Sequence, residues 1–255
     1  MYNMLMNTPQ NISRADDVRG LGTILFVGAH PDDETFCSGG LLAIAARNGQ
    51  RVICVTATHG EKGVQDEARW PAATLGQVRE QELSAALAQL GVREHIWLSY
   101  RDGECAQAGE DDAAQQIAAL IEHSAVDSVV TFGPDGYTGH PDHAAMSRWV
   151  DAAVHISTRK PRIYHIAQPR ETYERDLKAV DKTLHIFFNI KRPRLVEQPH
   201  CAVYLTLDQD ALVRKYLALK VMPSQTERLL SVVAPESFFG AFGVEALVDA
   251  TDVNT

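Results

Sequence analysis

Two short clusters of histidine and carboxylate residues contain the side chains of this sequence that could carry out chemistry. The first, His30-Pro31-Asp32-Asp33-Glu34, comes two residues after the apolar run 24–27. The second, His140-Pro141-Asp142-His143, follows the apolar run 129–132 and a turn rich in glycine, proline and aspartate. Imidazole and carboxylate groups in this combination bind divalent metals and transfer protons. Together the two clusters indicate a metal-dependent hydrolase.

The spacing within the clusters suits a single metal ion. His30 and Asp33 are three residues apart, which places both on one face of a helix's first turn, and His140 and His143 repeat the spacing. Catalytic zinc takes about three protein ligands from histidine and carboxylate and keeps a water. We therefore expect Zn²⁺, or another divalent transition metal, at this site. Asp32 lies beside a ligand but points elsewhere, so it is the candidate general base.

The remaining acids of the clusters have two interpretations each. Acidic residues favour helix N-termini because the free amides and the helix dipole attract negative charge. Glu34 is therefore expected to cap a helix or to support a ligand from outside the metal's own shell. Asp142 either orients His140 or His143 through the second imidazole nitrogen or caps the helix that follows. Capping alone would not require the histidines.

The elements that must position these clusters alternate along the chain. Continuous apolar segments at 24–27, 52–56, 96–98 and 129–132 predict buried parallel strands. Helical patterns follow them at 41–47, 77–90, 111–123 and 142–155. This alternation predicts an α/β fold with a Rossmann-like, doubly wound, mostly parallel sheet and helices on both faces. Beyond residue 161 we expect strands at 162–166 and 202–207, a helix at 211–219, and an α/β excursion over 170–199.

Composition limits the class of protein. The 255 residues are 45% hydrophobic and carry a net charge of −9, which disfavours nucleic acid and anionic membrane surfaces as partners. Four widely separated cysteines form no C-x-x-C pair and predict reduced thiols, so we expect a cytoplasmic protein. The polar residues 1–20 are expected to form a loose N-terminal tail without a signal peptide, and 21–255 a single domain.

At this point the clusters resemble a known family. Ala29-His30-Pro31-Asp32-Asp33-Glu34 and Gly139-His140-Pro141-Asp142-His143 are similar to the zinc-dependent N-acetylglucosaminide deacetylases of the PIG-L/LmbE type, which include the mycothiol and bacillithiol deacetylases. The resemblance spans about 24–155. It implies that His30, Asp33 and His143 bind zinc, that Asp32 is the general base, and that His140 polarises the oxyanion and helps to protonate the leaving amine. It also implies a small-molecule amino-sugar substrate and a homo-oligomer.

The resemblance extends to several isolated positions. Arg79 matches the arginine of the family's R-x-x-E helix, where it contacts substrate, and Asp102 matches a carboxylate that binds sugar hydroxyls. Without the resemblance, Arg79 and Glu82 are spaced as a solvated ion pair, and Asp102 beside a glycine is a turn former. Two departures concern Tyr137, one residue further from the second cluster than the tyrosine of some members, and Met222, near a position where the family often has a histidine.

Trp70 lies in the long segment 61–77, which we expect to form a functional lid whose aromatic ring stacks on a sugar face. The segment and the region after residue 161 are where substrate specificity is expected to be determined.

The sequence thus predicts a zinc-dependent amidohydrolase that removes an N-acetyl group from an N-acetylglucosamine-like amino sugar or glycoconjugate. Two alternatives stay open: an amidase of mycothiol-type thiol conjugates that cleaves a larger acyl group, and a non-catalytic sugar-binding domain in which the metal only joins two loops. Intact Asp32 and His140 argue against the last, because a structural metal site has a closed shell and needs no unliganded acid.

Overall fold

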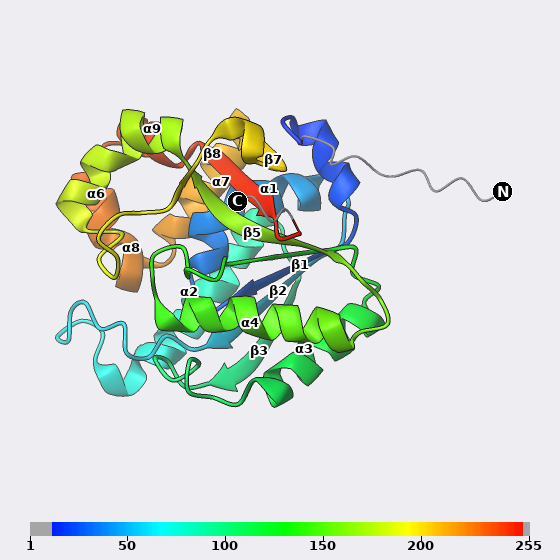
Figure 1. Ribbon diagram of the computed structural model, residues 1–255. Coiled ribbons are helices and arrows are strands. Elements are labelled where there is room, and N and C mark those ends of the chain that lie inside the picture. The colour runs from blue at the N-terminus through cyan, green and yellow to red at the C-terminus, as the bar shows by residue number, and fades with distance from the viewer. Residues whose placement is uncertain (1–11, 252–255) are drawn as a thin grey trace.

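The computed structural model describes residues 12–251, which build an α/β fold around one twisted sheet (Figure 1). The strand order is β3-β2-β1-β4-β5-β8-β7, and β6 pairs with β5. Five neighbouring strands are parallel: β1 (Ile24–Gly28), β2 (Val52–Thr58), β3 (Glu94–Tyr100), β4 (Ser128–Thr131) and β5 (Arg162–Pro169). The short β6 (Leu195–Val196) is also parallel to β5, whereas β8 (Val244–Asp249) is antiparallel to β5 and to β7 (Val203–Thr206).

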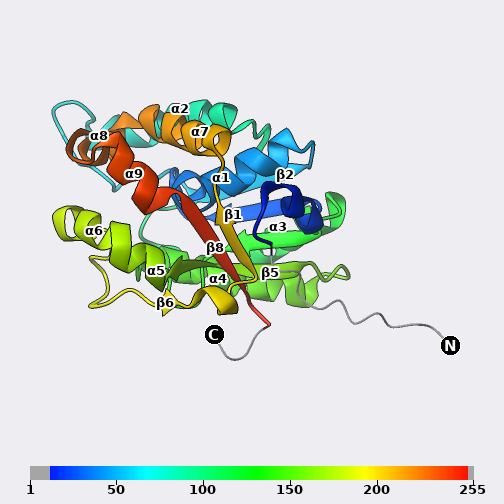
Figure 2. The same ribbon diagram turned by 90° about the horizontal axis from the view of Figure 1, so that it is seen from above.

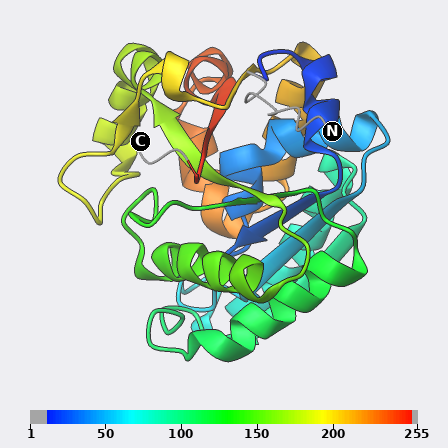
Figure 3. The ribbon, with the colours of Figure 1, turned by 45° about the vertical axis from the view of Figure 1, so that its right-hand side comes forward.

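Helices cover both faces of the sheet (Figure 2). On one face α1 (Asp33–Arg47), α2 (Ala72–Leu90) and α7 (Gln209–Lys220) pack together, and on the other α3 (Glu110–His123) packs against α4 (Pro141–Ile156). Figure 3 shows α3 and α4 side by side in front of the strands. The remaining helical elements are η1 (Ala15–Leu21), α5 (Arg170–Thr172), η2 (Tyr173–Leu177), α6 (Lys178–Leu184), η3 (Gln198–His200), α8 (Pro223–Val232) and α9 (Pro235–Phe242). The predicted doubly wound, mostly parallel sheet is confirmed.

The central strands form where the sequence has continuous apolar runs. Every residue of β1, β2 and β4 is buried, as expected for parallel strands covered by helices on both faces. The four predicted strands agree with β1 to β4 to within two residues at each end. The core therefore lies on both sides of the central strands and fixes their carboxyl ends at one edge of the sheet.

Strand order explains how the two clusters meet. β1 lies between β2 and β4, and the chain leaves β1 into α1 on one face but leaves β4 into α4 on the opposite face. The two loops diverge from neighbouring strands and open a crevice at the carboxyl ends, which is where ligands bind in doubly wound sheets. Residues more than a hundred positions apart are thus brought to the same place.

Two helices are several residues longer at their start than the predicted helical patterns. α1 begins at Asp33, at the helix start expected beside the first cluster, although its helical pattern was recognised only from residue 41, and α2 begins at Ala72 rather than at 77. The glycine pair in α1 has weak helix propensity, which hid the first turns of this helix. Packing accounts for the glycine: a Cβ on Gly40 would lie 2.3 Å from Leu207 Cδ2, so any larger residue would require the Leu207 side chain to move.

The expectation of a loose tail over residues 1–20 is wrong from residue 12 onward; residues 1–11 lie outside the described part. Ile12 forms a parallel bridge with Val203, and its side chain is 4% exposed. Val18 and Leu21 of η1 are fully buried. These apolar side chains hold the segment against the body of the protein, and their scatter among polar residues concealed this.

The region after residue 161 is more regular than predicted. The expected strands at 162–166 and 202–207 and the helix at 211–219 correspond to β5, β7 and α7. The helices α6, α8 and α9 and the strand β8 were not predicted. β8 lies between β5 and β7 in the sheet although it comes last of the three in the chain.

A buried ion pair joins these later elements to the first helix. Lys215 Nζ lies 2.7 Å from Glu245 Oε1, and the two side chains are 1% and 2% exposed. The Glu245 carboxylate also accepts hydrogen bonds from the backbone N–H groups of Gly40 and Leu41, at 2.8 and 2.7 Å. One carboxylate thus connects α1, α7 and β8.

Lys215→Met is expected to destabilise the fold by about 3–5 kcal/mol, because it leaves the buried Glu245 carboxylate without a counter-charge. Urea unfolding followed by circular dichroism measures the change. The double variant Lys215→Met/Glu245→Gln should recover much of the loss, because the amide is neutral. A single variant as stable as the wild type would contradict the account of this pair.

Candidate active site

Three predicted ligand side chains converge at the crevice. His143 Nε2 lies 3.3 Å from His30 Nδ1 and 3.3 Å from Asp33 Oδ1, and His30 Nδ1 lies 3.7 Å from Asp33 Oδ2. Donor atoms bound tetrahedrally to zinc at 2.0–2.1 Å are about 3.3 Å from one another. The two contacts of His143 have this spacing, whereas His30 approaches the other oxygen of the Asp33 carboxylate, so the three side chains surround one point from three sides.

The surrounding backbone holds the three donors in place. Asp33 Oδ2 accepts hydrogen bonds from the N–H groups of Ala29 and His30, at 2.9 and 2.8 Å. The His143 ring stacks on Phe132 with 3.9 Å between centroids, and its Nδ1 lies 3.1 Å from the carbonyl oxygen of Gly136. A carbonyl only accepts, so Nδ1 carries the proton and the Nε2 lone pair faces the centre of the cluster.

Two carboxylates lie behind His30. Its Nε2 is 3.2 Å from Asp102 Oδ1 and 3.4 Å from Asp142 Oδ2. The expectation that Asp142 orients His140 or His143 through its carboxylate is therefore corrected, because that carboxylate faces His30. A carboxylate on the second nitrogen of a histidine ligand fixes the ring and strengthens it as a metal ligand.

Asp102 differs from the predicted contact with sugar hydroxyls. It is 6% exposed, and its Oδ2 accepts a 2.8 Å hydrogen bond from the N–H of Lys62 while Oδ1 faces His30. Both oxygens are engaged within the protein. The structure thus places Asp102 where it orients His30 instead of where it could meet a substrate.

Charge is compensated inside the cluster. Burial opposes the charging of His30, but hydrogen bonds to Asp102 and Asp142 and the charge of Asp33 outweigh it and raise the His30 pKa to about 10. Burial would raise the pKa of Asp33, yet the adjacent His143 and His30 hold it well below its usual range. Asp33 is thus a carboxylate, as a metal ligand must be, and a metal at this site must displace a proton from His30.

Among the described residues, two groups of three offer donor atoms that all lie within 4.8 Å of one another: His30, His140 and His143, and His30, Asp102 and Asp142; neither includes Asp33. The carboxylates of the second group already accept backbone hydrogen bonds, with Asp142 bonded to Gly103 N at 2.7 Å and to Cys105 N at 3.1 Å. The first group lacks a negative charge and would leave Asp33 beside the ion. Asp33 also accepts backbone hydrogen bonds, but only through Oδ2, and its Oδ1 faces His143 Nε2, so Asp33 could supply the negative charge that the first group lacks.

Asp32 is held apart from this trio in a strained conformation. Its φ of 109° is in the left-handed region that residues other than glycine seldom adopt, and its Oδ2 lies 3.0 Å from Arg79 Nη2. Burial raises the Asp32 pKa to about 6, against the opposing charge of Arg79. Strain of this kind persists at functional sites where the surrounding structure enforces it. The Asp32 carboxylate is thus held by Arg79 and follows its own conformation, apart from that of the neighbouring Asp33.

Arg79 contacts the loops rather than an open surface. The side chain is buried and donates to Gly60 O at 2.8 Å and to Pro31 O, besides contacting Asp32. Its expected contact with substrate is replaced by contacts that join the loops after β1 and β2. Glu82 on the same helix accepts a 2.9 Å hydrogen bond from the N–H of Ser224, so no ion pair forms between Arg79 and Glu82.

His140 and Glu34 occupy helix ends. His140 is the N-cap of α4, and its Nδ1 accepts a 3.2 Å hydrogen bond from the Asp142 N–H. Its ring centroid is 4.7 Å from that of His30. Burial and the neighbouring charges of His30 and His143 lower the His140 pKa. Glu34 Oε2 accepts a 3.2 Å hydrogen bond from the Asp32 N–H, which supports the loop as the capping interpretation expected.

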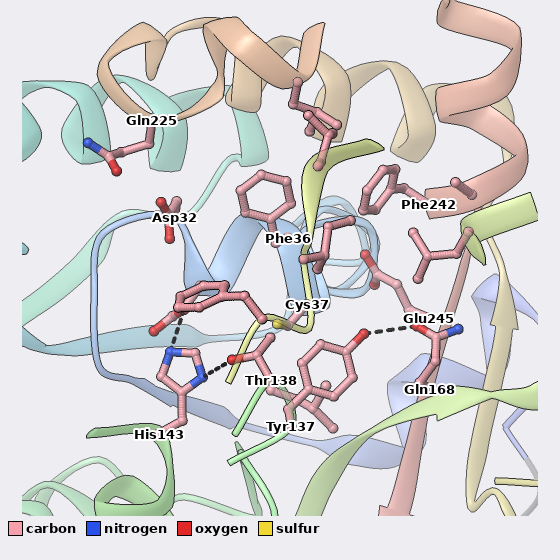
Figure 4. Close-up of a pocket in the computed structure, with 18 of the residues that line it drawn as sticks. Asp32, Phe36, Cys37, Tyr137, Thr138, His143, Gln168, Gln225, Phe242 and Glu245 are labelled. Atoms are coloured by element: carbon pink, nitrogen blue, oxygen red, sulfur yellow. Dashed lines mark hydrogen bonds and ion pairs between the residues drawn. The ribbon is translucent and has the colours of Figure 1, made fainter. Parts of the chain in front are cut away.

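A cavity of about 630 Å³ adjoins the cluster, and Asp32, Asp33 and His143 form part of its wall (Figure 4). Tyr137 also lines it, with its hydroxyl donating to Gln168 Oε1 at 3.0 Å. Trp70 does not line this cavity; the guanidinium of Arg69 lies 4.3 Å above its ring.

Several residues that build the site and the adjoining cavity were not identified from the sequence. Phe132, the carbonyl of Gly136 and Gln168 were assigned no role, and Met222 is buried at 1% exposure. The role of a main-chain carbonyl cannot be recognised from residue types. The stacking of Phe132 on His143 depends on the path of the chain between β4 and α4. The glycine-rich turn before the second cluster was the one available signal.

Within residues 12–251, no helix has the length and hydrophobicity needed to cross a membrane.

Comparison with known proteins agrees with this site. Residues 25–154 match the PIG-L family, described as GlcNAc-PI de-N-acetylase. A 1D-myo-inositol 2-acetamido-2-deoxy-alpha-D-glucopyranoside deacetylase of Saccharomonospora viridis is 29% identical over 252 residues, covering 90% of this chain and 92% of the relative. The protein of the same name from Actinosynnema mirum is 31% identical and covers 79% and 80%. The predicted deacetylase class of enzyme is thereby confirmed.

Solved structures show the same fold. The N,N'-diacetylchitobiose deacetylase from Pyrococcus horikoshii superposes with a TM-score of 0.64 at 20% identity and covers 92% of this chain and 86% of its own. The family match includes both histidine and carboxylate clusters and just over half of the 255 residues. The chain therefore belongs to the PIG-L family of de-N-acetylases.

Proposed function

We propose that this protein is a zinc-dependent de-N-acetylase that hydrolyses the N-acetyl group of a small molecule containing N-acetylglucosamine. The observation that carries the proposal is an unliganded carboxylate, Asp32, next to the three convergent donors His30, Asp33 and His143. The two relatives named above act, by their names, on a 2-acetamido-2-deoxyglucopyranoside, which is an N-acetylglucosamine glycoside.

The donor set suits zinc. Two imidazoles and one carboxylate leave a coordination position open, as catalytic zinc sites do. Zinc bound there would polarise the amide carbonyl and lower the pKa of a water to about 7. A structural zinc site would have four protein ligands instead, so the three-donor set favours catalysis over a metal that only joins two loops.

Asp32 is proposed as the base that takes a proton from the attacking water. Its Oδ2 accepts from Arg79, and Oδ1 accepts no hydrogen bond from the described residues, so one oxygen is available. Arg79 also fixes the loop carbonyls of Pro31 and Gly60, and in this way it holds the carboxylate in a single position. The base is thereby oriented before substrate binds.

His140 is proposed as the donor to the oxyanion and then to the leaving nitrogen. Its Nδ1 is an acceptor for the Asp142 N–H, so in the neutral ring the proton is on Nε2. The neighbouring His30 ring is 4.7 Å away. Because oxyanion donors act where charge develops in the transition state, this histidine should affect turnover more than binding.

The amidase of thiol conjugates is the less favoured alternative, since the relatives are named as deacetylases. We also infer a cytoplasmic location from the cysteines, all four of which are free thiols. The acidic net charge of −9 supports a small-molecule substrate over a polyanionic partner.

Asp32→Asn and His140→Ala should each retain one zinc per chain and lose activity by roughly 100- to 1000-fold, because neither residue is a ligand. Asparagine also tolerates the positive φ of residue 32. Metal analysis of the dialysed proteins and acetate release from methyl N-acetylglucosaminide give the two readouts. Asp33→Asn, the matched acid-to-amide control, should lose the metal. Loss of zinc from His140→Ala would instead favour the trio of histidines.

Arg79→Met should move the acidic limb of the pH profile of kcat/KM to higher pH. The base must be deprotonated, and the charge of Arg79 lowers the Asp32 pKa, so removing that charge raises the pH at which the base becomes active. Arg79→Lys keeps the charge and should keep the limb near that of the wild type while lowering kcat. If the acidic limbs of the pH profiles coincide for Arg79→Met and Arg79→Lys, the charge of Arg79 does not control the pKa of the base.

Asp102→Asn should weaken zinc binding by roughly 10- to 100-fold, because an amide is a weaker partner for the second nitrogen of His30. Competition with a chromophoric chelator measures the dissociation constant. Glu104→Gln, an acid-to-amide change at a carboxylate that contacts Lys62 instead of the cluster, is the control. Equal affinities in the two variants would mean that Asp102 does not act through His30.

A further inference from the structure

A second cavity, of about 890 Å³, lies next to the one that adjoins the donor cluster. It is formed by α5, η2, α6 and the segment 185–194, which follows α6 and leads into β6 (Figure 2). His185 and Phe188 line both cavities, so the two spaces meet at these side chains. The volume is within the range of pockets that enclose small ligands, and the proposed hydrolysis makes no use of it.

The segment 185–194 packs against the loop that carries the second histidine cluster. A Cβ on Gly139 would lie 2.3 Å from Ile190 Cγ2, so Ile190 rests directly on the residue that precedes this cluster. Phe187 is 5% exposed, and its ring centroid lies 5.6 Å from that of Tyr137, which lines the first cavity. These contacts hold the wall of the second cavity beside the active site.

Positive charge predominates in the wall of the second cavity. Besides His185, the wall contains five cationic side chains and two carboxylates: Arg170, Lys178, Lys182, Lys191 and Arg192 against Glu174 and Asp181. The chain as a whole carries a net charge of −9, yet residues 182–196 contain four lysines and arginines and no aspartate or glutamate. The cavity is therefore a local exception to an acidic protein.

Both carboxylates of the wall already have partners within the protein. Glu174 forms an ion pair with Lys178. Asp181 accepts hydrogen bonds from the Tyr173 hydroxyl and from the N–H of Phe187, at 3.0 and 3.1 Å. These two acids are thus engaged in holding η2, α6 and the following segment together.

Three cations of the wall are left over. Arg170 pairs with Glu197, outside the cavity. Within residues 12–251, no carboxylate forms an ion pair with Lys182, Lys191 or Arg192. Their side chains are exposed, so they can turn toward a ligand from the rim of the cavity. Three cations around one hollow attract anions, because the walls concentrate the electrostatic potential.

The chemistry of these side chains suits an oxyanion. A guanidinium binds phosphate or carboxylate through two parallel hydrogen bonds, and an ammonium binds either as a point charge. The first cavity continues the positive charge, since Arg228 lines it and forms no ion pair in the described part of the chain. A hollow surrounded by α6 and the segment after it encloses a small anion better than it fits a flat anionic surface.

From these observations we propose that the second cavity binds a multiply charged oxyanion, a phosphate group or a group of carboxylates, through Lys182, Lys191 and Arg192. The anion is either a substituent of the substrate, which reaches past His185 and Phe188 from the first cavity, or a separate small molecule. The first source rests on the proposed de-N-acetylase function, whereas the site itself does not.

Calorimetry with inorganic phosphate on the zinc-loaded full chain tests the site without turnover. Lys191→Gln/Arg192→Gln should weaken phosphate binding about tenfold or more, because both lost groups form charge-assisted hydrogen bonds, and Lys182→Gln should weaken it in the same direction. The control, Arg93→Gln/Lys220→Gln, removes the same charge from exposed positions that line neither cavity. Phosphate held by the metal would respond equally to both double variants, and this result overturns the inference.

Matched substrates identify the source of the anion. N-acetylglucosaminides that end in a phosphate, on an ethyl or a hexyl linker at the anomeric oxygen, are compared with partners that end in a hydroxyl. If the anion belongs to the substrate, kcat/KM should be about tenfold or more higher for a phosphorylated member, and Lys191→Gln/Arg192→Gln should abolish this preference. If the anion is a separate ligand, the preference is absent while phosphate still binds the wild type.

The outcomes separate this site from the proposed function. Phosphate binding that requires Lys191 and Arg192, with no hydrolysis of any N-acetylglucosaminide, supports the site and overturns the proposed function. Hydrolysis without phosphate binding does the reverse. Adsorption to phosphatidylglycerol vesicles that is lost in Lys191→Gln/Arg192→Gln, with no binding of phosphate, would assign these charges to a membrane surface and overturn the inference.

Discussion

The site depends on one constraint: carboxylates buried at the carboxyl ends of β1, β3 and β4 must be compensated by cationic partners. Asp33, Asp102 and Asp142 surround His30, and each is less than 10% exposed. Unpaired charges at such burial would be costly, so the imidazoles and backbone N–H groups that contact them are required by the fold as well as by the chemistry. A divalent cation at this cluster would replace the His30 proton as the counter-charge of these carboxylates.

Carboxylates around the cavity are likewise paired with buried cationic side chains. Arg79 neutralises Asp32 and fixes the loop carbonyls, which lets residue 32 keep a strained φ of 109°. At the opposite side of the cavity Lys215 neutralises Glu245, whose carboxylate also holds the backbone of α1. Both ends of the cavity are thus built by buried ion pairs, and both pairs use partners that are distant in sequence.

The sequence was sufficient to predict the features that depend on residues close together in the chain. The His-Pro-Asp-Asp and His-Pro-Asp-His motifs identified the clustered donors, and apolar runs located β1 to β4, because both features depend on neighbouring residues. It was insufficient where contacts are long-range. Asp142 belongs to the second motif, yet its carboxylate contacts His30 across 112 positions. Glu245 interrupts an apolar run, and its long-range contacts with Lys215 and with the backbone of α1 explain how β8 can be a buried strand.

X-ray absorption at the zinc edge of the zinc-loaded protein tests the central claim most directly. The account predicts two imidazole nitrogens, one carboxylate oxygen and one further oxygen from an exchangeable ligand, with the imidazole signal reduced by one in His143→Ala and unchanged in His140→Ala. Four protein ligands, or an imidazole signal lost in His140→Ala, would contradict it.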